Sequence, residues 1–95
     1  MLSGSTPQRR EVRYRGDVQG VGFRFTTVRM ARGYAVTGFV RNESDGSVRL
    51  VVEGALAEIE AFLHDLAEAM SGNIRDVMLQ ELLATGEFKD FTLRR

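Results

Sequence analysis

Residues 11–24 read EVRYRGDVQGVGFR, and this stretch determines how the rest of the sequence is interpreted. Its first half places Val12, Tyr14 and Val18 among charged side chains, an alternation that is typical of a β-strand. Its second half contains glycines, which adopt backbone angles that are closed to other residues, and from Arg24 onward the spacing becomes helical. A strand, a glycine-containing loop and a helix are therefore predicted in this order.

The residues that follow predict a hairpin. Gly33 is a plausible end of the first helix, and residues 34–42 (YAVTGFVRN) alternate well enough for a second strand. Asp45 and Gly46 form a strong turn signal, and residues 47–54 (SVRLVVEG) then predict a third strand.

The second half repeats the same order of elements. From residue 55 to residue 70, apolar side chains recur every three or four positions, which predicts an amphipathic helix with one buried face. That face is expected to contain Leu56, Ile59, Leu63, Leu66 and Met70. Residues 74–83 predict a fourth strand, residues 84–87 a turn, and residues 88–95 a short last strand.

This order of elements predicts the fold class. Two β-α-β halves joined by a hairpin form the split βαβ, or ferredoxin-like, α+β sandwich. We expect an antiparallel sheet of four to five strands with both helices on one face. Because this fold supports many unrelated functions, it does not by itself identify one.

The chain divides into a short leader and one domain. Residues 1–10 (MLSGSTPQRR) are small, polar and basic and show no periodicity, so they are predicted to be a mobile leader. The domain is expected to occupy residues 11–95, a length that supports one modest core.

Composition excludes several classes of function. The chain has 13 basic and 13 acidic residues, so no bulk positive charge is available for nucleic acid or for an anionic membrane surface. It has no cysteine and one histidine, His64, which removes thiolate chemistry and multi-histidine metal sites. No apolar run is long enough to span a membrane. We expect a cytoplasmic monomer.

The loop and the start of the first helix are the candidate binding site. Main-chain N–H groups in such a loop, together with the free N–H groups of the first helical turn, converge on an anion such as phosphate. Arg24 lies in that first turn, where a cation opposes the helix dipole unless an anion is bound. In the predicted topology Asn42, at the end of the second strand, lies beside this loop, where its amide holds a water molecule.

Simpler interpretations exist for the same residues. The loop matches neither the Walker nor the dinucleotide-binding pattern, so alone it favours a tight turn with Arg24 as a surface charge. An asparagine before Glu-Ser-Asp-Gly commonly shapes a turn. Phenylalanines are a possible stacking platform for RNA, but at this spacing they more often belong to a core. These are Phe23, Phe25, Phe39 and Phe62.

Two segments together resemble a known family. The segments GDVQGVGFR (residues 16–24) and GFVRNESDGSVRLVVEG (residues 38–54) are similar to the two signature segments of the acylphosphatase family, and their separation agrees as well. The ending TGEFKDFTLRR resembles the closing strand of that family. The resemblance covers the chain from about Glu11 to its end.

The resemblance implies the ferredoxin-like fold and hydrolysis of acyl phosphates to a carboxylate and inorganic phosphate, without a metal or organic cofactor. It implies that Arg24 binds phosphate and that Asn42 orients the attacking water. The phosphate-binding loop is then Gln19, Gly20, Val21, Gly22 and Phe23. A non-catalytic module that binds an anion or docks on a partner remains the alternative, and RNA recognition through the sheet is a third hypothesis.

Overall fold

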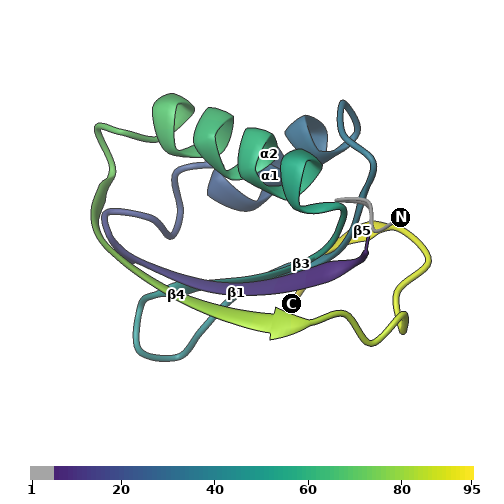
Figure 1. Cartoon of the computed structure of the whole chain (residues 1–95). Coiled ribbons are helices and arrows are strands. Elements are labelled where there is room, and N and C mark those ends of the chain that lie inside the picture. Colours follow the sequence, from purple (N-terminus) through teal and green to yellow (C-terminus); the bar gives the residue numbers. More distant parts are fainter. Residues whose placement is uncertain (1–5) are drawn as a thin grey trace.

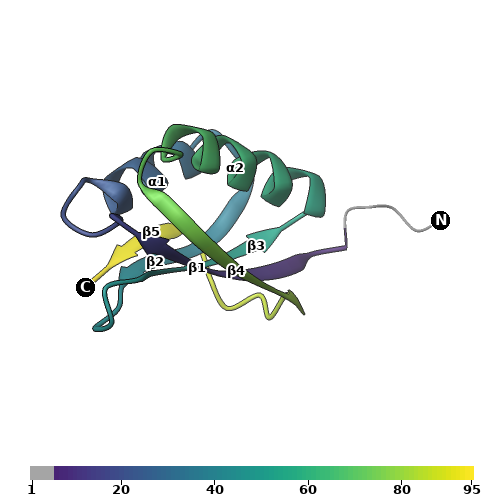
Figure 2. The same cartoon turned by 90° about the vertical axis from the view of Figure 1, so that its left-hand side faces the viewer.

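The computed structural model describes residues 6–95 and contains two layers, a twisted sheet and a pair of helices (Figure 1). The elements in chain order are β1 (Gln8–Gly16), α1 (Phe23–Ala31), β2 (Val36–Asn42), β3 (Val48–Gly54), α2 (Leu56–Ala69), β4 (Ile74–Leu83) and β5 (Phe91–Arg94). Both helices lie on the same face of the sheet (Figures 1 and 2). The ferredoxin-like α+β fold is therefore confirmed. Neither helix in residues 6–95 is long and apolar enough to cross a membrane.

The sheet has the strand order β4-β1-β3-β2-β5. β1 pairs antiparallel with β3 and β4, and β2 pairs antiparallel with β3. β5 instead pairs in parallel with β2, so the sheet is mixed rather than wholly antiparallel. The long segment between β4 and β5 makes this possible, because it carries the chain across to the opposite edge of the sheet.

The core lies between the sheet and the helices. Strand residues that face the helices are buried, with Val40, Leu50 and Val52 fully enclosed. On α2 the buried face contains Ile59, Phe62, Leu66 and Met70. The predicted face omitted Phe62, and Leu56 and Leu63 are only partly buried, because the helix rolls toward the phenylalanine, whose large ring packs against Tyr34 and Phe91.

The first strand begins earlier than expected, and the last strand begins later. β1 starts at Gln8, so its first residues fall inside the stretch that was predicted to be a mobile leader. Arg9 bonds to Glu53, and Arg10 is buried at 8% exposure, which explains why two arginines join the strand. The rest of that prediction, residues 1–5, lies outside the described residues. The last strand starts at Phe91 instead of residue 88.

The face of the sheet opposite the helices is covered by charged pairs and by the segment 84–90. Glu53 is 4% exposed and accepts hydrogen bonds from the backbone N–H groups of Thr85 and Gly86. Burial opposes ionisation of Glu53, but these bonds and those from the Thr85 hydroxyl and Arg9 outweigh it, so its pKa is lowered. The chain leading to β5 is thereby fixed to the centre of the sheet.

Candidate active site

The loop between β1 and α1 is held at both ends by buried side chains. Val18 and Phe23 are each 1% exposed, and the Phe23 ring packs against Tyr14 with centroids 5.1 Å apart. The residues between them are more exposed, with Val21 at 41%. Burial of the two ends therefore fixes the backbone of an accessible loop, which is the arrangement that a preorganised binding loop requires.

The loop ends in an uncapped helix N-terminus. Gly22 precedes α1 with φ 80°, a left-handed conformation that glycine adopts without strain, and Gly20 has φ 76°. No side chain caps α1, and no acidic residue lies in its first turn. Within residues 6–95, no protein hydrogen bond uses the N–H groups of Gly20, Val21, Gly22 or Phe23. These N–H groups, with the positive end of the helix dipole, are suited to bind an anion.

Arg24 supplies positive charge at the same place. Its Nη1 donates a hydrogen bond to the backbone carbonyl oxygen of Arg94, at 3.0 Å. Among residues 6–95 no acidic side chain lies within ion-pair distance of it. Because a single carbonyl bond leaves most of its donors free, the guanidinium is oriented by the protein and still able to bind an anion with two bonds.

Asn42 lies at the end of β2, on the face of the sheet that carries the helices. Its side-chain carbonyl oxygen, Oδ1, is buried and has no hydrogen-bond partner in the described part of the chain. Leaving a buried acceptor unpaired costs about 1–3 kcal/mol. Such an atom beside a cavity indicates a group that accepts a hydrogen bond from a bound molecule.

A cavity of about 220 Å³ brings these groups together. Of the predicted site residues, Gly20, Gly22, Phe23, Arg24 and Asn42 line it. Val18 and Phe25 complete the lining. Gln19 and Val21, the other two residues of the predicted loop, do not line the cavity. The Asp45 and Gly46 turn lies elsewhere, as the sequence predicted.

The side chain of Gln19 has a structural role that was not predicted from the sequence. Its Nε2 donates to the backbone oxygens of Glu43, at 2.7 Å, and Ser47, at 2.8 Å. These two residues lie in the turn between β2 and β3, immediately after Asn42. Gln19 therefore ties the loop to the strand end that carries Asn42. A signal was present in the sequence, since glutamine in an otherwise small and apolar loop is unexpected, but its partners follow only from the fold.

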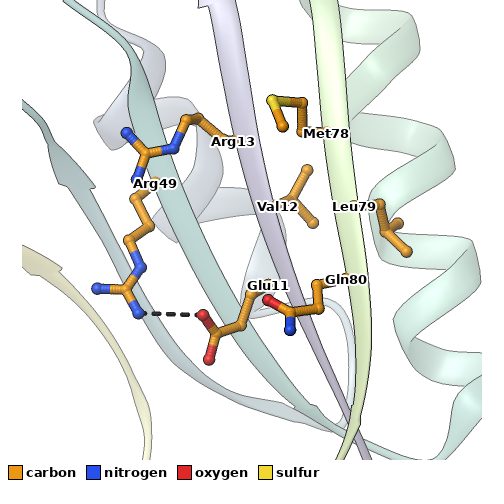
Figure 3. A pocket seen from close by; sticks show the side chains of 7 residues that line it. All are labelled: Glu11, Val12, Arg13, Arg49, Met78, Leu79 and Gln80. Carbon is orange, nitrogen blue, oxygen red and sulfur yellow. Dashed lines mark hydrogen bonds and ion pairs between the residues drawn. The ribbon is translucent and has the colours of Figure 1, made fainter. Parts of the chain in front are cut away.

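A second hollow, of about 200 Å³, lies on the opposite face of the sheet (Figure 3). Figure 3 shows Glu11 and Arg49 paired within it, at 3.0 Å. Burial opposes ionisation of Glu11, but hydrogen bonds from Arg49 and Arg9 outweigh it and lower its pKa. Arg13, also in this hollow, bonds to Ser47 and Asp45. Glu11, Arg13 and Arg49 therefore all have hydrogen-bond partners, in contrast to the Oδ1 of Asn42.

The remaining titratable groups do not form a second site. His64 is 74% exposed beside Asp65 on α2, as expected for a residue outside the buried face. No group of three or more His, Asp or Glu side chains within residues 6–95 is arranged to hold a metal ion.

Comparison with known proteins places these features in a family. The sequence model named Acylphosphatase matches residues 10–93. An acylphosphatase of Salinibacter ruber is 43% identical over 95 residues, covering 99% of this chain and 100% of that protein. An acylphosphatase of Paenarthrobacter aurescens is 44% identical, covering 85% of this chain and 87% of its own length. The crystal structure of Bacillus subtilis acylphosphatase, at 22% identity, shares the fold with a TM-score of 0.82 and covers 93% of this chain and 99% of that one.

Proposed function

The chain belongs to the acylphosphatase family, and we propose that Arg24, Asn42 and the loop of residues 19–23 carry out its reaction. As an acylphosphatase, the protein hydrolyses the carboxyl-phosphate bond of an acyl phosphate to a carboxylate and inorganic phosphate. The observation that carries the residue assignment is the cavity in which Arg24, the loop glycines and the unpaired Oδ1 of Asn42 meet.

Phosphate binding is assigned to the loop and Arg24. The free N–H groups of residues 20–23 donate to phosphate oxygens, and the Arg24 guanidinium binds two of those oxygens from the side. The transition state of phosphoryl transfer spreads negative charge over the three equatorial oxygens. Donors that are already in place stabilise this charge without rearrangement, so they lower the barrier as well as bind the ground state.

Water activation is assigned to Asn42. Its Oδ1 accepts a hydrogen bond from the attacking water and directs the oxygen lone pair toward phosphorus. A neutral amide positions water without removing its proton, so the proton passes to a phosphate oxygen as the water oxygen bonds to phosphorus. The main effect of Asn42 is therefore orientation, which converts a bimolecular encounter into a step within the complex.

The leaving group needs no acid from the protein. The bond between phosphorus and the acyl oxygen breaks as the water oxygen adds, and the electron pair leaves with the carboxylate. A carboxylic acid has a pKa of about 4, so its anion departs without protonation at neutral pH. This explains how a cavity lined by an arginine, an amide and backbone groups, without histidine or a carboxylate, supports the reaction.

The proposal includes three properties of the whole molecule. Every residue of the site comes from one chain, so the catalytic unit is a monomer. The exposed apolar residues Val77, Met78 and Leu79 on edge strand β4 are flanked by Asp76 on one side and by Gln80 and Glu81 on the other, and charged groups on an edge oppose pairing with another sheet. The location is the cytoplasm, because a chain without cysteine suits a reducing compartment. The third property is that the domain, whose first strand begins at Gln8, acts on a small molecule and binds neither nucleic acid nor a membrane.

The surface opposite the helices supports that last point. Phe39 is 4% exposed and lies under the Arg94 guanidinium, 4.0 Å from the ring centroid, so it is not available to stack on a base. Arg41 and Arg49 on the same face are paired with Glu43 and Glu11. RNA recognition requires exposed aromatic rings and unpaired basic groups, and this face has neither at its centre.

The test is hydrolysis of benzoyl phosphate by the purified protein in excess chelator, beside Arg24→Ala, Asn42→Ala and the control Arg75→Ala. Arg75 is an exposed arginine near the start of β4; it lies beside Gly16 at the end of β1 but does not line the cavity. We expect turnover by the parent and by the control, and strong loss in the other two. Turnover that survives both substitutions in folded protein would overturn the assignment. A folded parent that binds phosphate without turnover would favour the non-catalytic binding module.

A further inference from the structure

We propose that the acyl part of the substrate lies along α1 in a groove that continues from the phosphate site, and that the preferred acyl group carries a second negative charge. The proposal rests on the proposed function, because it extends the same site from the phosphate to the leaving group.

Two cavities adjoin at Phe25. This residue lines the phosphate cavity and also a second one of about 270 Å³. The second cavity is lined by Phe25, Val28, Arg29, Arg32 and Leu93. α1 and β5 lie against each other, so both walls of this groove belong to packed elements. Phe25 itself is 72% exposed, which leaves its ring available to a ligand on either side.

The direction of the reaction places the acyl group in this groove. In an in-line displacement the leaving oxygen lies opposite the attacking water. Asn42 Oδ1 is buried on the inner side of the cavity, whereas Phe25 stands at its exposed rim. Water held by Asn42 therefore attacks the phosphorus from the inner side of the cavity, and the acyl group points outward past Phe25. Apolar carbons of the acyl group gain contact with this ring and with Val28.

Charge distinguishes this groove from the rest of the surface. Six arginines of the sheet have acidic partners: Arg9, Arg10, Arg13, Arg15, Arg41 and Arg49. Arg29 and Arg32 are exposed, and within residues 6–95 no acidic side chain lies within ion-pair distance of either. α1 contains no acidic residue. Within residues 6–95, Arg75, Lys89, Arg94 and Arg95 also lack an acidic partner, but of the unpaired basic residues only Arg24, Arg29 and Arg32 line the two adjoining cavities.

Spacing along the helix fits a short acyl chain. With a rise of about 1.5 Å per residue, Arg29 and Arg32 lie about 8 Å and about 12 Å beyond Arg24 along the axis. Helical side chains lean toward the N-terminus, which shortens both distances. An acyl phosphate whose chain ends in a carboxylate or a phosphate a few bonds from the acyl carbon brings its distal anion to these guanidinium groups.

The experiment compares two four-carbon substrates, succinyl phosphate with a distal carboxylate and butyryl phosphate without one. The ratio of their kcat/KM values is measured for the parent, for the double variant Arg29→Gln with Arg32→Gln, and for the control Arg75→Gln. We expect the parent and the control to prefer succinyl phosphate by about fivefold to tenfold, since exposed ion pairs each contribute about twofold to fivefold. The double variant should bring the ratio close to one.

Further measurements distinguish failure of this inference from failure of the proposed function. The preference should shrink at high salt, because exposed charges are screened. A substrate with a distal phosphate, compared with one bearing a carboxylate, identifies which anion is preferred. Equal use of succinyl and butyryl phosphate by an active parent would overturn the inference and leave Arg29 and Arg32 as stabilisers of the helix C-terminus. Hydrolysis of neither substrate, nor of benzoyl phosphate, would instead overturn the proposed function.

Phe25→Ala tests the apolar wall independently of charge. We expect KM for benzoyl phosphate to rise severalfold, with a smaller effect on acetyl phosphate, whose acyl group is too short to cover the ring. An equal change for both substrates would show that Phe25 acts on the phosphate site, and would overturn its place in the acyl groove.

Discussion

Arg24 and Arg94 are separated by 70 residues in the chain, yet Arg24 Nη1 donates a hydrogen bond to the Arg94 backbone carbonyl oxygen at 3.0 Å. The Arg94 guanidinium, on the other face of the sheet, stacks 4.0 Å from the centroid of Phe39. The last strand therefore connects the core of the opposite face to the residue that is proposed to bind phosphate. Five predictions follow from the geometry of this and the neighbouring contacts.

Removal of Arg94 and Arg95 together should weaken phosphate binding. Arg24 then loses the acceptor that orients it. A hydrogen bond to a charged group contributes about 1.5–3 kcal/mol, so we expect kcat/KM to fall by roughly tenfold to a hundredfold, mainly through KM. Steady-state kinetics and inhibition by inorganic phosphate measure the effect. Arg95→Ala, which keeps the Arg94 carbonyl in a peptide bond, is the control and should change neither quantity.

Arg24 and Asn42 should affect different kinetic parameters. We expect either alanine substitution to lower kcat/KM by about 10² to 10³, the scale of losing one preorganised stabilising group. Arg24→Ala should also abolish inhibition by phosphate, whereas Asn42→Ala should keep that inhibition and lower kcat, because Asn42 holds the water rather than the anion. Equal loss of phosphate affinity in both variants would contradict these separate roles.

Gln19→Glu should reduce activity although the side chain at this position does not contact the substrate. The change preserves the shape of the side chain but replaces the Nε2 donor by an oxygen that faces two backbone carbonyls. Leaving buried acceptors unpaired costs about 1–3 kcal/mol, so stability and kcat should both decline as the strand end with Asn42 loosens. Thermal unfolding and kinetics report the two effects. Gln80→Glu on the exposed β4 is the matched control for kcat; it is not a control for stability, because the new charge lies opposite Glu11 in the sheet.

Gly22→Ala should strain the backbone rather than cause a steric clash. An added Cβ meets no atom within 4 Å, but Gly22 has φ 80°. Holding alanine in a left-handed conformation costs about 1–2 kcal/mol. If the loop relaxes to relieve that strain, its N–H groups diverge and the phosphate inhibition constant rises. Chemical denaturation together with phosphate inhibition measures both. Unchanged stability would show that the loop adopts other conformations freely.

Protonation of Glu53 should make the stability of the protein fall as the pH becomes acidic. Its folded-state pKa lies below the ordinary value of 4.5, so the unfolded chain binds a proton first as pH falls. The stabilisation is complete above pH 4.5 and is lost as pH falls through the folded pKa. Glu53→Gln should cost about 1–3 kcal/mol at pH 7, and its acid unfolding curve should be flatter. Glu60→Gln, on the exposed face of α2, should leave the curve of the parent unchanged.

The sequence alone determined the kind of fold and the position of the loop. Alternation of apolar residues predicted the strands, and β4 occupies the predicted residues because its limits are marked by Asn73 and by the turn at residues 84–87. The glycines around Arg24 predicted a loop before a helix. The sequence also predicts Arg24 and Asn42 as site residues, through the resemblance of two segments at a fixed separation to those of one family. These features are local, so neighbouring residues encode them.

Tertiary structure decided which groups meet. The parallel pairing of β5, the bond from Arg24 to Arg94 and the bonds from Gln19 to the β2–β3 turn all join residues that are distant in sequence. The unpaired Oδ1 of Asn42 and the groove at Phe25 likewise exist only when several elements pack together. Periodicity reports which face of an element is buried but not which neighbour buries it, and that neighbour is selected by packing of the whole chain.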